Sequence, residues 1–100
     1  MGVKEAAVEK YLKQEVVKIG GVAYKFVSPS RRSVPDRLCV FPKGFHAFVE
    51  CKAEGGTLTK GQVREIDRLS ALDQPIVIVS SRDDVDEFIF MVQKVLKGEA

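Results

Sequence analysis

The segment SVPDRLCVFPKGFHAFVECKA, residues 33–53, decides the predicted fold of this chain. It contains two runs that are rich in β-forming residues, 36–41 and 45–53. Between them lies Pro42-Lys43-Gly44, a sequence typical of a tight turn. This pattern predicts a β-hairpin.

Charged residues interrupt the apolar pattern of the hairpin. Asp36 begins the first strand, while Glu50 and Lys52 stand one residue apart in the second. Side chains alternate between the faces of a strand, so Glu50 and Lys52 share a face, and antiparallel pairing brings Asp36 close to both. One explanation is that these charges simply face water. The other is that the two carboxylates and the Cys51 carbonyl oxygen hold Mg²⁺ or Mn²⁺, with Lys52 orienting a water and offsetting phosphate charge.

The rest of the chain extends this hairpin to an α/β arrangement. Apolar residues at helical spacing predict a helix over 3–19, which Gly20-Gly21 ends. We further expect a strand over 23–28, a helix beginning at Thr59, a strand over 76–80 and a third helix after Ser81. The order is αβββαβα. The apolar run at 76–79 within the fourth predicted strand suggests that this strand is covered on both faces.

Composition places the chain among ordinary globular proteins. Its 100 residues are 45% hydrophobic and 30% charged, with a net charge of +2, and we expect one domain over 1–100. That charge is too small to indicate nucleic-acid binding by itself. Two cysteines provide neither a disulfide framework nor a zinc-ligand pairing, and no signal peptide or membrane-spanning run is evident. We therefore expect a cytoplasmic protein.

Two helical polar residues are candidates for the same site. Glu5 projects onto the inward stripe of the first helix, and Glu9 lies at the edge of that stripe. An inward glutamate needs a partner or a cation, although a solvated first helical turn would also accommodate Glu5. Gln62 lies on the inward face of the second helix, where it could contact the metal cluster or the attacking water. Its spacing from Thr59 also fits a capping box, and we expect the functional geometry to prevail over the structural one.

In this order and over this pattern of elements, Glu5, Val34-Pro35-Asp36-Arg37, Glu50-Cys51-Lys52 and Gln62 resemble the PD-(D/E)XK nuclease superfamily. The closer resemblance is to its VRR-NUC branch, the virus-type replication–repair nuclease domain. It covers nearly the whole chain, from the first helix to the run at 76–80. The resemblance implies a restriction-endonuclease-like core, with a central mixed sheet flanked by helices.

The resemblance also implies a divalent-metal-dependent deoxyribonuclease. Asp36 and Glu50 would be metal ligands assisted by the Cys51 carbonyl, Lys52 the catalytic lysine, Glu5 (or Glu9) the acid of the first helix, and Gln62 the downstream glutamine. Minimal domains of this branch resemble homodimers that cleave branched DNA such as four-way junctions. The short chain would suit a prokaryotic or phage-infected host cell. One departure is Ser33, where the branch often has glycine.

Several further residues have both a functional and an ordinary explanation. Basic residues around the expected site would contact phosphates or form a solvated charged face: Arg31, Arg32, Arg37, Lys43, Lys60 and Arg64. Tyr11 and Phe90 would be isolated surface aromatics or part of a dimer surface. His46 fits strand packing better than metal binding. The competing function is a catalytically silent module that binds DNA or a partner protein; a nuclease acting on RNA lacks support because the chain has one histidine.

Overall fold

The structure is a computed structural model that describes residues 3–99. Its elements are, in chain order, α1 (Glu5–Lys18), β1 (Val22–Lys25), β2 (Arg37–Val40), the 3₁₀ turn η1 (Pro42–Gly44), β3 (His46–Cys51), α2 (Lys60–Ala71), β4 (Ile76–Val79) and α3 (Arg82–Leu96). The expected αβββαβα order is therefore confirmed, with shorter strands than the sequence pattern suggested. Within residues 3–99, no helix is long and apolar enough to cross a bilayer.

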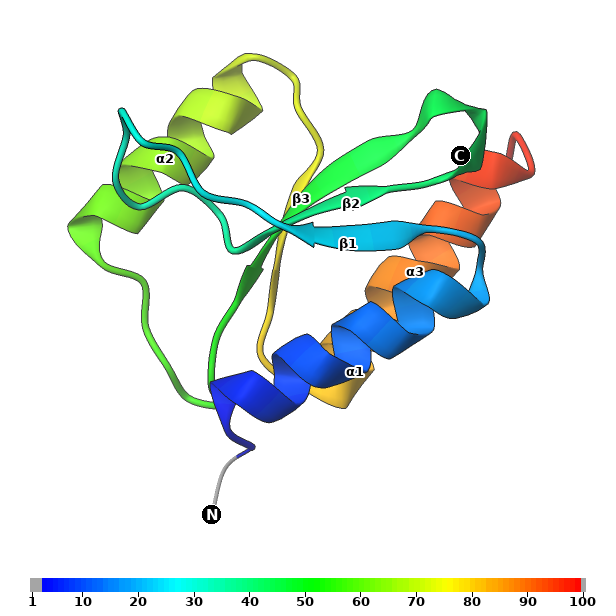
Figure 1. Ribbon diagram of the computed structural model, residues 1–100, viewed down its shortest axis with the longest axis horizontal. Coiled ribbons are helices and arrows are strands. Elements are labelled where there is room, and N and C mark those ends of the chain that lie inside the picture. Colours follow the sequence, from blue (N-terminus) through cyan, green and yellow to red (C-terminus); the bar gives the residue numbers. More distant parts are fainter. Residues whose placement is uncertain (1–2, 100) are drawn as a thin grey trace.

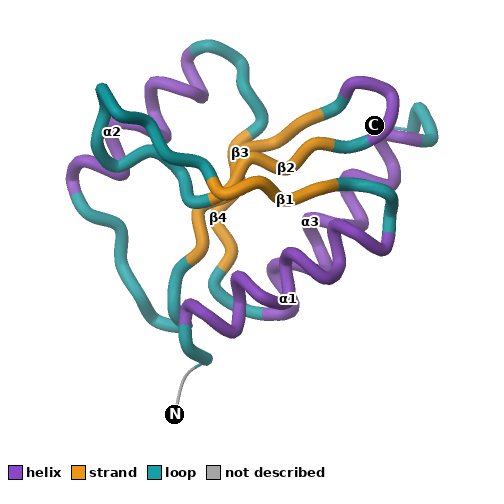
Figure 2. The backbone as a smooth tube through the Cα atoms, viewed as in Figure 1, coloured by secondary structure: helices purple, strands orange, loops and turns teal. Residues whose placement is uncertain are grey.

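The four strands form one mixed sheet in the order β1-β2-β3-β4 (Figures 1 and 2). β1, β2 and β3 pair antiparallel, whereas β3 and β4 run parallel. In the β2–β3 hairpin Val40 faces His46 beside the turn, and Arg37 faces Val49 at the other end. The α/β class, the mixed sheet and the predicted hairpin are thus confirmed.

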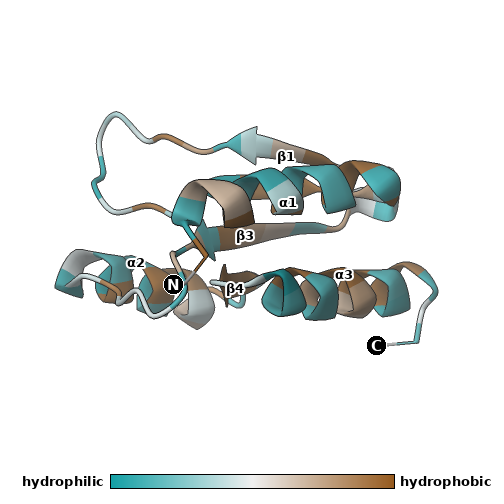
Figure 3. Ribbon diagram, turned by 90° about the horizontal axis from the view of Figure 1, so that it is seen from below, coloured by the Kyte–Doolittle hydropathy of each residue, from teal (hydrophilic) through white to brown (hydrophobic). Residues whose placement is uncertain are grey.

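The apolar core lies between one face of the sheet and the two helices α1 and α3, which lie side by side (Figures 1 and 3). The stripe predicted for α1 is buried at Val8, Leu12 and Val16. The sheet contributes every second residue of its central strands to this core, namely Cys39, Ala47, Val49 and Cys51. Each fully buried aliphatic side chain contributes about 1.5–3 kcal/mol to folding. Alternation leaves the opposite face of β3 to Phe48 and Glu50.

β4 does not have the predicted coverage on both faces. It is an edge strand, and Ile78 keeps 44% of its surface exposed while Val79 is buried. The parallel register places Ile78 beside Glu50, on the sheet face that α1 and α3 leave uncovered. The apolar run therefore reflects one buried face and one partly exposed face rather than two buried ones.

Candidate active site

The far end of the hairpin brings the two predicted carboxylates together. Asp36 immediately precedes β2, and Glu50 is the fifth residue of β3. The backbone N–H of Cys51 donates to Asp36 Oδ2 over 2.8 Å. Within a strand, the N–H and C=O of one residue face the same neighbouring strand, so the Cys51 carbonyl also faces the Asp36 side.

Glu50 is a buried carboxylate with two polar neighbours. Only 2% of its surface is exposed. Glutamate is seldom buried to this extent unless its carboxylate has a partner. Gln62 Nε2 donates to Glu50 Oε2 over 3.0 Å, and Lys52 Nζ lies 3.7 Å from the same oxygen. Burial, reinforced by the charge of Asp36, raises the pKa of Glu50 to about 7, against the opposing effect of Lys52. The site therefore holds a carboxyl group that titrates near neutral pH.

Gln62 forms the capping box and also contacts Glu50, one of the predicted metal ligands. Its Oε1 accepts from the Thr59 N–H over 2.9 Å, and its own N–H donates to Thr59 Oγ1 over 3.1 Å, which completes a capping box at the start of α2. The amide nitrogen remains free to reach Glu50. The expectation that only one geometry could prevail was wrong, because a carboxamide presents an acceptor and a donor at different atoms.

The structure distinguishes the two acidic residues of α1. Glu9 is engaged by Arg37, with Nη2 2.6 Å and Nε 2.7 Å from Glu9 Oε2. Glu5 lies in the first helical turn and is exposed rather than inward-facing, because that turn precedes the buried stripe. Its negative charge nevertheless contributes to raising the Glu50 pKa. Glu5 and Glu9 thus differ in their partners, and the assignment of Glu5 as the acid of the first helix stays a prediction.

Two of the six basic residues expected around the site have other roles. Lys43 lies in η1, at the opposite end of the hairpin, where its Nζ donates to the Leu96 carbonyl near the end of α3. Glu50 lies six residues beyond Gly44, the end of that turn, which is about 20 Å along an extended chain, so the expectation that Lys43 flanks the site was wrong. The Arg37 guanidinium is 12% exposed and also donates to the Ala23 carbonyl over 3.2 Å.

The remaining basic residues lie on the α2 side of the site. Arg31 pairs with Glu65, the one residue of α2 that is buried, at 2.9 Å. Arg32 in the preceding loop is exposed, as are Lys60 and Arg64 in the first turns of α2. Arg31 and Arg32 belong to the loop that leads to Asp36, and the phosphate contacts expected of these four residues stay a prediction.

Ser33 in that loop has an unusual backbone conformation. Its φ angle is +64°, in the left-handed region that glycine adopts without steric cost. An added Cβ at Gly61 would lie 2.6 Å from Ser33 Oγ, so the loop and the start of α2 are in close contact. This geometry gives a physical reason why glycine would be the ordinary residue at position 33.

Three other expectations concern residues away from the carboxylates. His46 Nε2 lies 2.8 Å from Gln74 Oε1, and its ring packs edge-on against Phe48, as expected for a strand packing residue. Tyr11 is not part of a free apolar surface, because its hydroxyl donates to Asp86 over 2.6 Å within the α1–α3 contact. Phe90 is 60% exposed.

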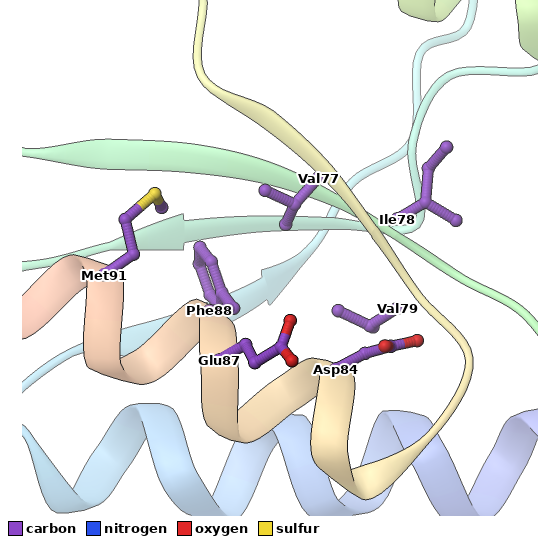
Figure 4. A pocket seen from close by; sticks show the side chains of 7 residues that line it. All are labelled: Val77, Ile78, Val79, Asp84, Glu87, Phe88 and Met91. Atoms are coloured by element: carbon purple, nitrogen blue, oxygen red, sulfur yellow. The ribbon is translucent and has the colours of Figure 1, made fainter.

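A separate hollow lies beside β4 and α3 (Figure 4). Its volume is about 250 Å³, and its lining residues are Val77, Ile78, Val79, Asp84, Glu87, Phe88 and Met91. None of the predicted site residues lines it. The candidate active site is instead the junction of the β2–β3 hairpin with the first turns of α1 and α2.

We compared the sequence and the fold with those of known proteins. No family model matches the sequence. A solved structure described as "VRR_NUC domain" superposes with a TM-score of 0.81 and 33% sequence identity, covering 87% of this chain and 95% of the other. This chain belongs to the VRR-NUC family. It is also 53% identical over 81 residues to "Putative nuclease p44" of Acyrthosiphon pisum secondary endosymbiont phage 1, which spans 81% of this chain and 87% of that protein.

The donor set of this VRR-NUC domain fits a hard divalent cation. Asp36 and Glu50 each have one carboxylate oxygen that accepts none of the hydrogen bonds described above, and the Cys51 carbonyl faces the same side. Residues 3–99 contain no group of three or more His, Cys, Asp or Glu side chains arranged to hold a metal. Mg²⁺ is commonly bound by one or two carboxylates, with waters and substrate phosphates completing its octahedron. Two carboxylates are therefore sufficient for this type of site.

Proposed function

We propose that this VRR-NUC domain is a Mg²⁺- or Mn²⁺-dependent DNA endonuclease that hydrolyses phosphodiester bonds. Family membership indicates a nuclease, and the proposal adds the metal, the substrate and the residues that act on it. The observation that carries it is the buried Glu50 carboxylate, which lies between Gln62 and Lys52 and beside Asp36. Burying an acid next to another acid destabilises the fold, and a cation bound by both would offset that cost.

Asp36, Glu50 and the Cys51 carbonyl would hold the metal, with Glu5 close enough to add negative charge. When bound, such an ion polarises a phosphoryl oxygen and lowers the pKa of a coordinated water. Hydrolysis forms one bond from the water oxygen to phosphorus and breaks one P–O bond of the backbone.

The side chains around the carboxylates would position the reactants. Lys52 supplies an ammonium group that can neutralise the phosphate charge and orient the attacking water. Gln62 fixes the rotamer of Glu50 through its amide, so that the carboxylate is oriented before substrate arrives. Arg32, Lys60 and Arg64 would contact phosphates without reading base sequence, and Arg31 would do so while paired with Glu65.

A cleavage assay with a matched control tests this proposal. Plasmid, forked and four-way-junction DNA are incubated with Mg²⁺ or Mn²⁺ and either the wild type, Lys52→Ala or Lys97→Ala. Lys97 is exposed beyond the end of α3, so its removal controls for the loss of one positive charge. We expect the wild type and Lys97→Ala to cleave, with a preference for branched DNA, and Lys52→Ala to lose at least about 100-fold in rate.

Metal binding provides an independent measurement. Calorimetry with Mn²⁺ should detect a site in the wild type that disappears in Asp36→Asn. A wild type that binds DNA but neither binds Mn²⁺ nor cleaves any substrate would instead identify a catalytically silent binding module. Equal cleavage by the wild type and Lys52→Ala would also refute the proposal.

We also propose that the domain acts as a homodimer, in which a second copy pairs along the free edge of β4. This edge strand contains only apolar residues, and Ile78, Phe90 and Met91 are exposed near it or on the adjacent helix α3. An uncovered apolar edge favours pairing with another strand, and two-fold pairing of identical strands would place two sites symmetrically on a junction. Light scattering should give twice the monomer mass for the wild type and the monomer mass for Ile78→Lys. A monomeric wild type at micromolar concentration would refute this part.

A further inference from the structure

A second hollow lies between α1 and the end of β1. Its volume is about 320 Å³, and it is lined by Ala6, Glu9, Lys10, Lys13, Lys25 and Arg37. Lys25 and Arg37 face each other in the β1–β2 register, which places them on the same sheet face as α1. None of the three lysines stood out in the sequence, where each resembles an ordinary solvated charge.

The hollow carries an uncompensated positive charge. Its only carboxylate, Glu9, is already neutralised by Arg37 at 2.6 Å. Lys10, Lys13 and Lys25 are exposed, and none of them lies within ion-pair distance of a carboxylate among residues 3–99. Three ammonium groups therefore surround one concave surface without an internal partner.

Two residues that line the hollow directly follow predicted site residues in the sequence. Ala6 directly follows Glu5, and Arg37 directly follows Asp36. Lys10 and Lys13 are five and eight residues beyond Glu5 on α1, which corresponds to about 8 and 12 Å along the helix axis. A DNA strand advances about 3.4 Å per nucleotide, so these lysines would reach phosphates roughly two to four nucleotides from the bond being cut.

The chemistry of the lining suits a phosphate backbone rather than a protein. Ala6 is the only apolar lining residue and is small, so an extended polyanion can approach the helix closely. Protein interfaces usually bury an apolar or aromatic core, which this surface lacks. Lysine ammonium groups act as point charges and neutralise phosphates without requiring a particular base sequence.

We propose that this hollow, lined by Lys10, Lys13 and Lys25, binds the sugar–phosphate backbone of the DNA on the α1 side of the active site. The inference rests on the proposed function and deepens it. The substrate would be held on both sides of the carboxylates, by this hollow and by the basic residues of the Arg31–Arg32 loop and α2.

The salt dependence of DNA binding tests this surface without requiring cleavage. A fluorescent four-way junction is titrated in EDTA, at several NaCl concentrations, with the wild type and two triple variants. The hollow variant is Lys10→Gln, Lys13→Gln, Lys25→Gln, and the control is Lys18→Gln, Lys94→Gln, Lys97→Gln, which makes the same change in charge at exposed positions elsewhere. Each phosphate contact contributes about 0.9 to the slope of log K against log salt. We expect the magnitude of this slope to be smaller than in the wild type by about 2 to 3 for the hollow variant and by less than about 1 for the control.

The outcomes separate this inference from the proposed function. Equal slopes for the hollow and control variants, or no DNA binding by the wild type, would refute the proposal that the hollow binds DNA. A wild type that fails to cleave with Mn²⁺ but shows the slope difference would refute the nuclease proposal and leave the surface standing. Loss of binding to polyglutamate in the hollow variant, with an unchanged slope for DNA, would assign the hollow to an acidic protein and overturn the proposal.

Discussion

Gln62 donates from Nε2 to Glu50 Oε2 over 3.0 Å while its Oε1 accepts from the Thr59 N–H over 2.9 Å. One side chain thus joins the first turn of α2 to the buried carboxylate of β3. Because both of its polar atoms are engaged, Gln62 has little rotational freedom. The orientation of the Glu50 carboxylate therefore depends on where the first turn of α2 lies.

Substitution of Gln62 should separate capping from catalysis. Gln62→Glu keeps a side chain suited to the capping box but replaces the amide donor with a second carboxylate facing Glu50, whereas Gln62→Ala removes both contacts. We expect Gln62→Glu to keep the helix-capping contribution and both variants to lose about 10- to 100-fold in the single-turnover cleavage rate. Thermal unfolding at pH 5, where Glu50 is protonated, measures the capping contribution. A fully active Gln62→Ala would contradict the positioning role.

Glu50 should make the metal-free protein less stable as the pH rises. Its pKa is raised from 4.5 to about 7, so between these values the folded state holds a proton that the unfolded state has released. Stability should therefore fall by about 3 kcal/mol from pH 4.5 to pH 7 and then level off. Glu50→Gln should remove this decline and be more stable than the wild type at pH 8, but not at pH 5.

Chemical denaturation at pH 5 and pH 8 measures this difference, with Glu87→Gln, an exposed glutamate of α3, as the control. Excess Mn²⁺ at pH 8 should restore stability to the wild type and leave Glu50→Gln unchanged, because the ion requires the ionised carboxylate. A wild type whose stability is flat across this range would show that Glu50 is not buried as described.

Ser33 and Gly61 should be energetically coupled. A serine at φ +64° costs about 1 kcal/mol relative to glycine, so Ser33→Gly should stabilise the protein modestly. Gly61→Ala places a methyl group 2.6 Å from Ser33 Oγ and should destabilise the wild type by about 1–3 kcal/mol. In the Ser33→Gly background that cost should largely disappear. A double-mutant cycle on unfolding free energies measures the coupling, and additivity of the two changes would contradict the contact.

Arg37 should act mainly on stability rather than on DNA binding. Its guanidinium is 12% exposed, binds Glu9 and donates to the Ala23 carbonyl. Removing it leaves a half-buried carboxylate and a carbonyl without their partner, so Arg37→Gln should cost about 2 kcal/mol of folding free energy. The salt slope of DNA binding should change little. A variant of unchanged stability but a markedly smaller slope would place Arg37 among the DNA contacts instead.

The hairpin and the helices could be predicted because their patterns are local. Alternation in β3 and helical spacing in α1 and α3 each bury one face, and the single residue between Glu50 and Lys52 fixes their shared face without further information. The coverage of β4 could not be predicted in the same way. An apolar run has the same composition whether one face or both are buried, and only the strand order places Ile76–Val79 at the edge.

The surroundings of the carboxylates depended on contacts that no short-range pattern contains. Lys43 is close to Asp36 in sequence but lies at the other end of the hairpin, because the chain reverses there. Glu9 and Arg37 are separated by 28 residues and meet only when α1 packs on β2. The same packing pairs Arg37 with Glu9, so Arg37 does not add to the surface charge of the hollow. Lys10, Lys13 and Lys25 supply that charge instead.

The anchoring of α2 has a consequence for how the site assembles. Its one buried residue is the charged Glu65, held by Arg31, whereas α1 and α3 are fixed by the apolar core. The helix that carries Gln62 should thus open locally at a lower free energy than the rest of the fold. A ligand would then bind Glu50 only in molecules in which α2 is closed. The measured affinity would therefore be weaker than the intrinsic affinity, and it would depend on the local folding of α2 as well as on coordination.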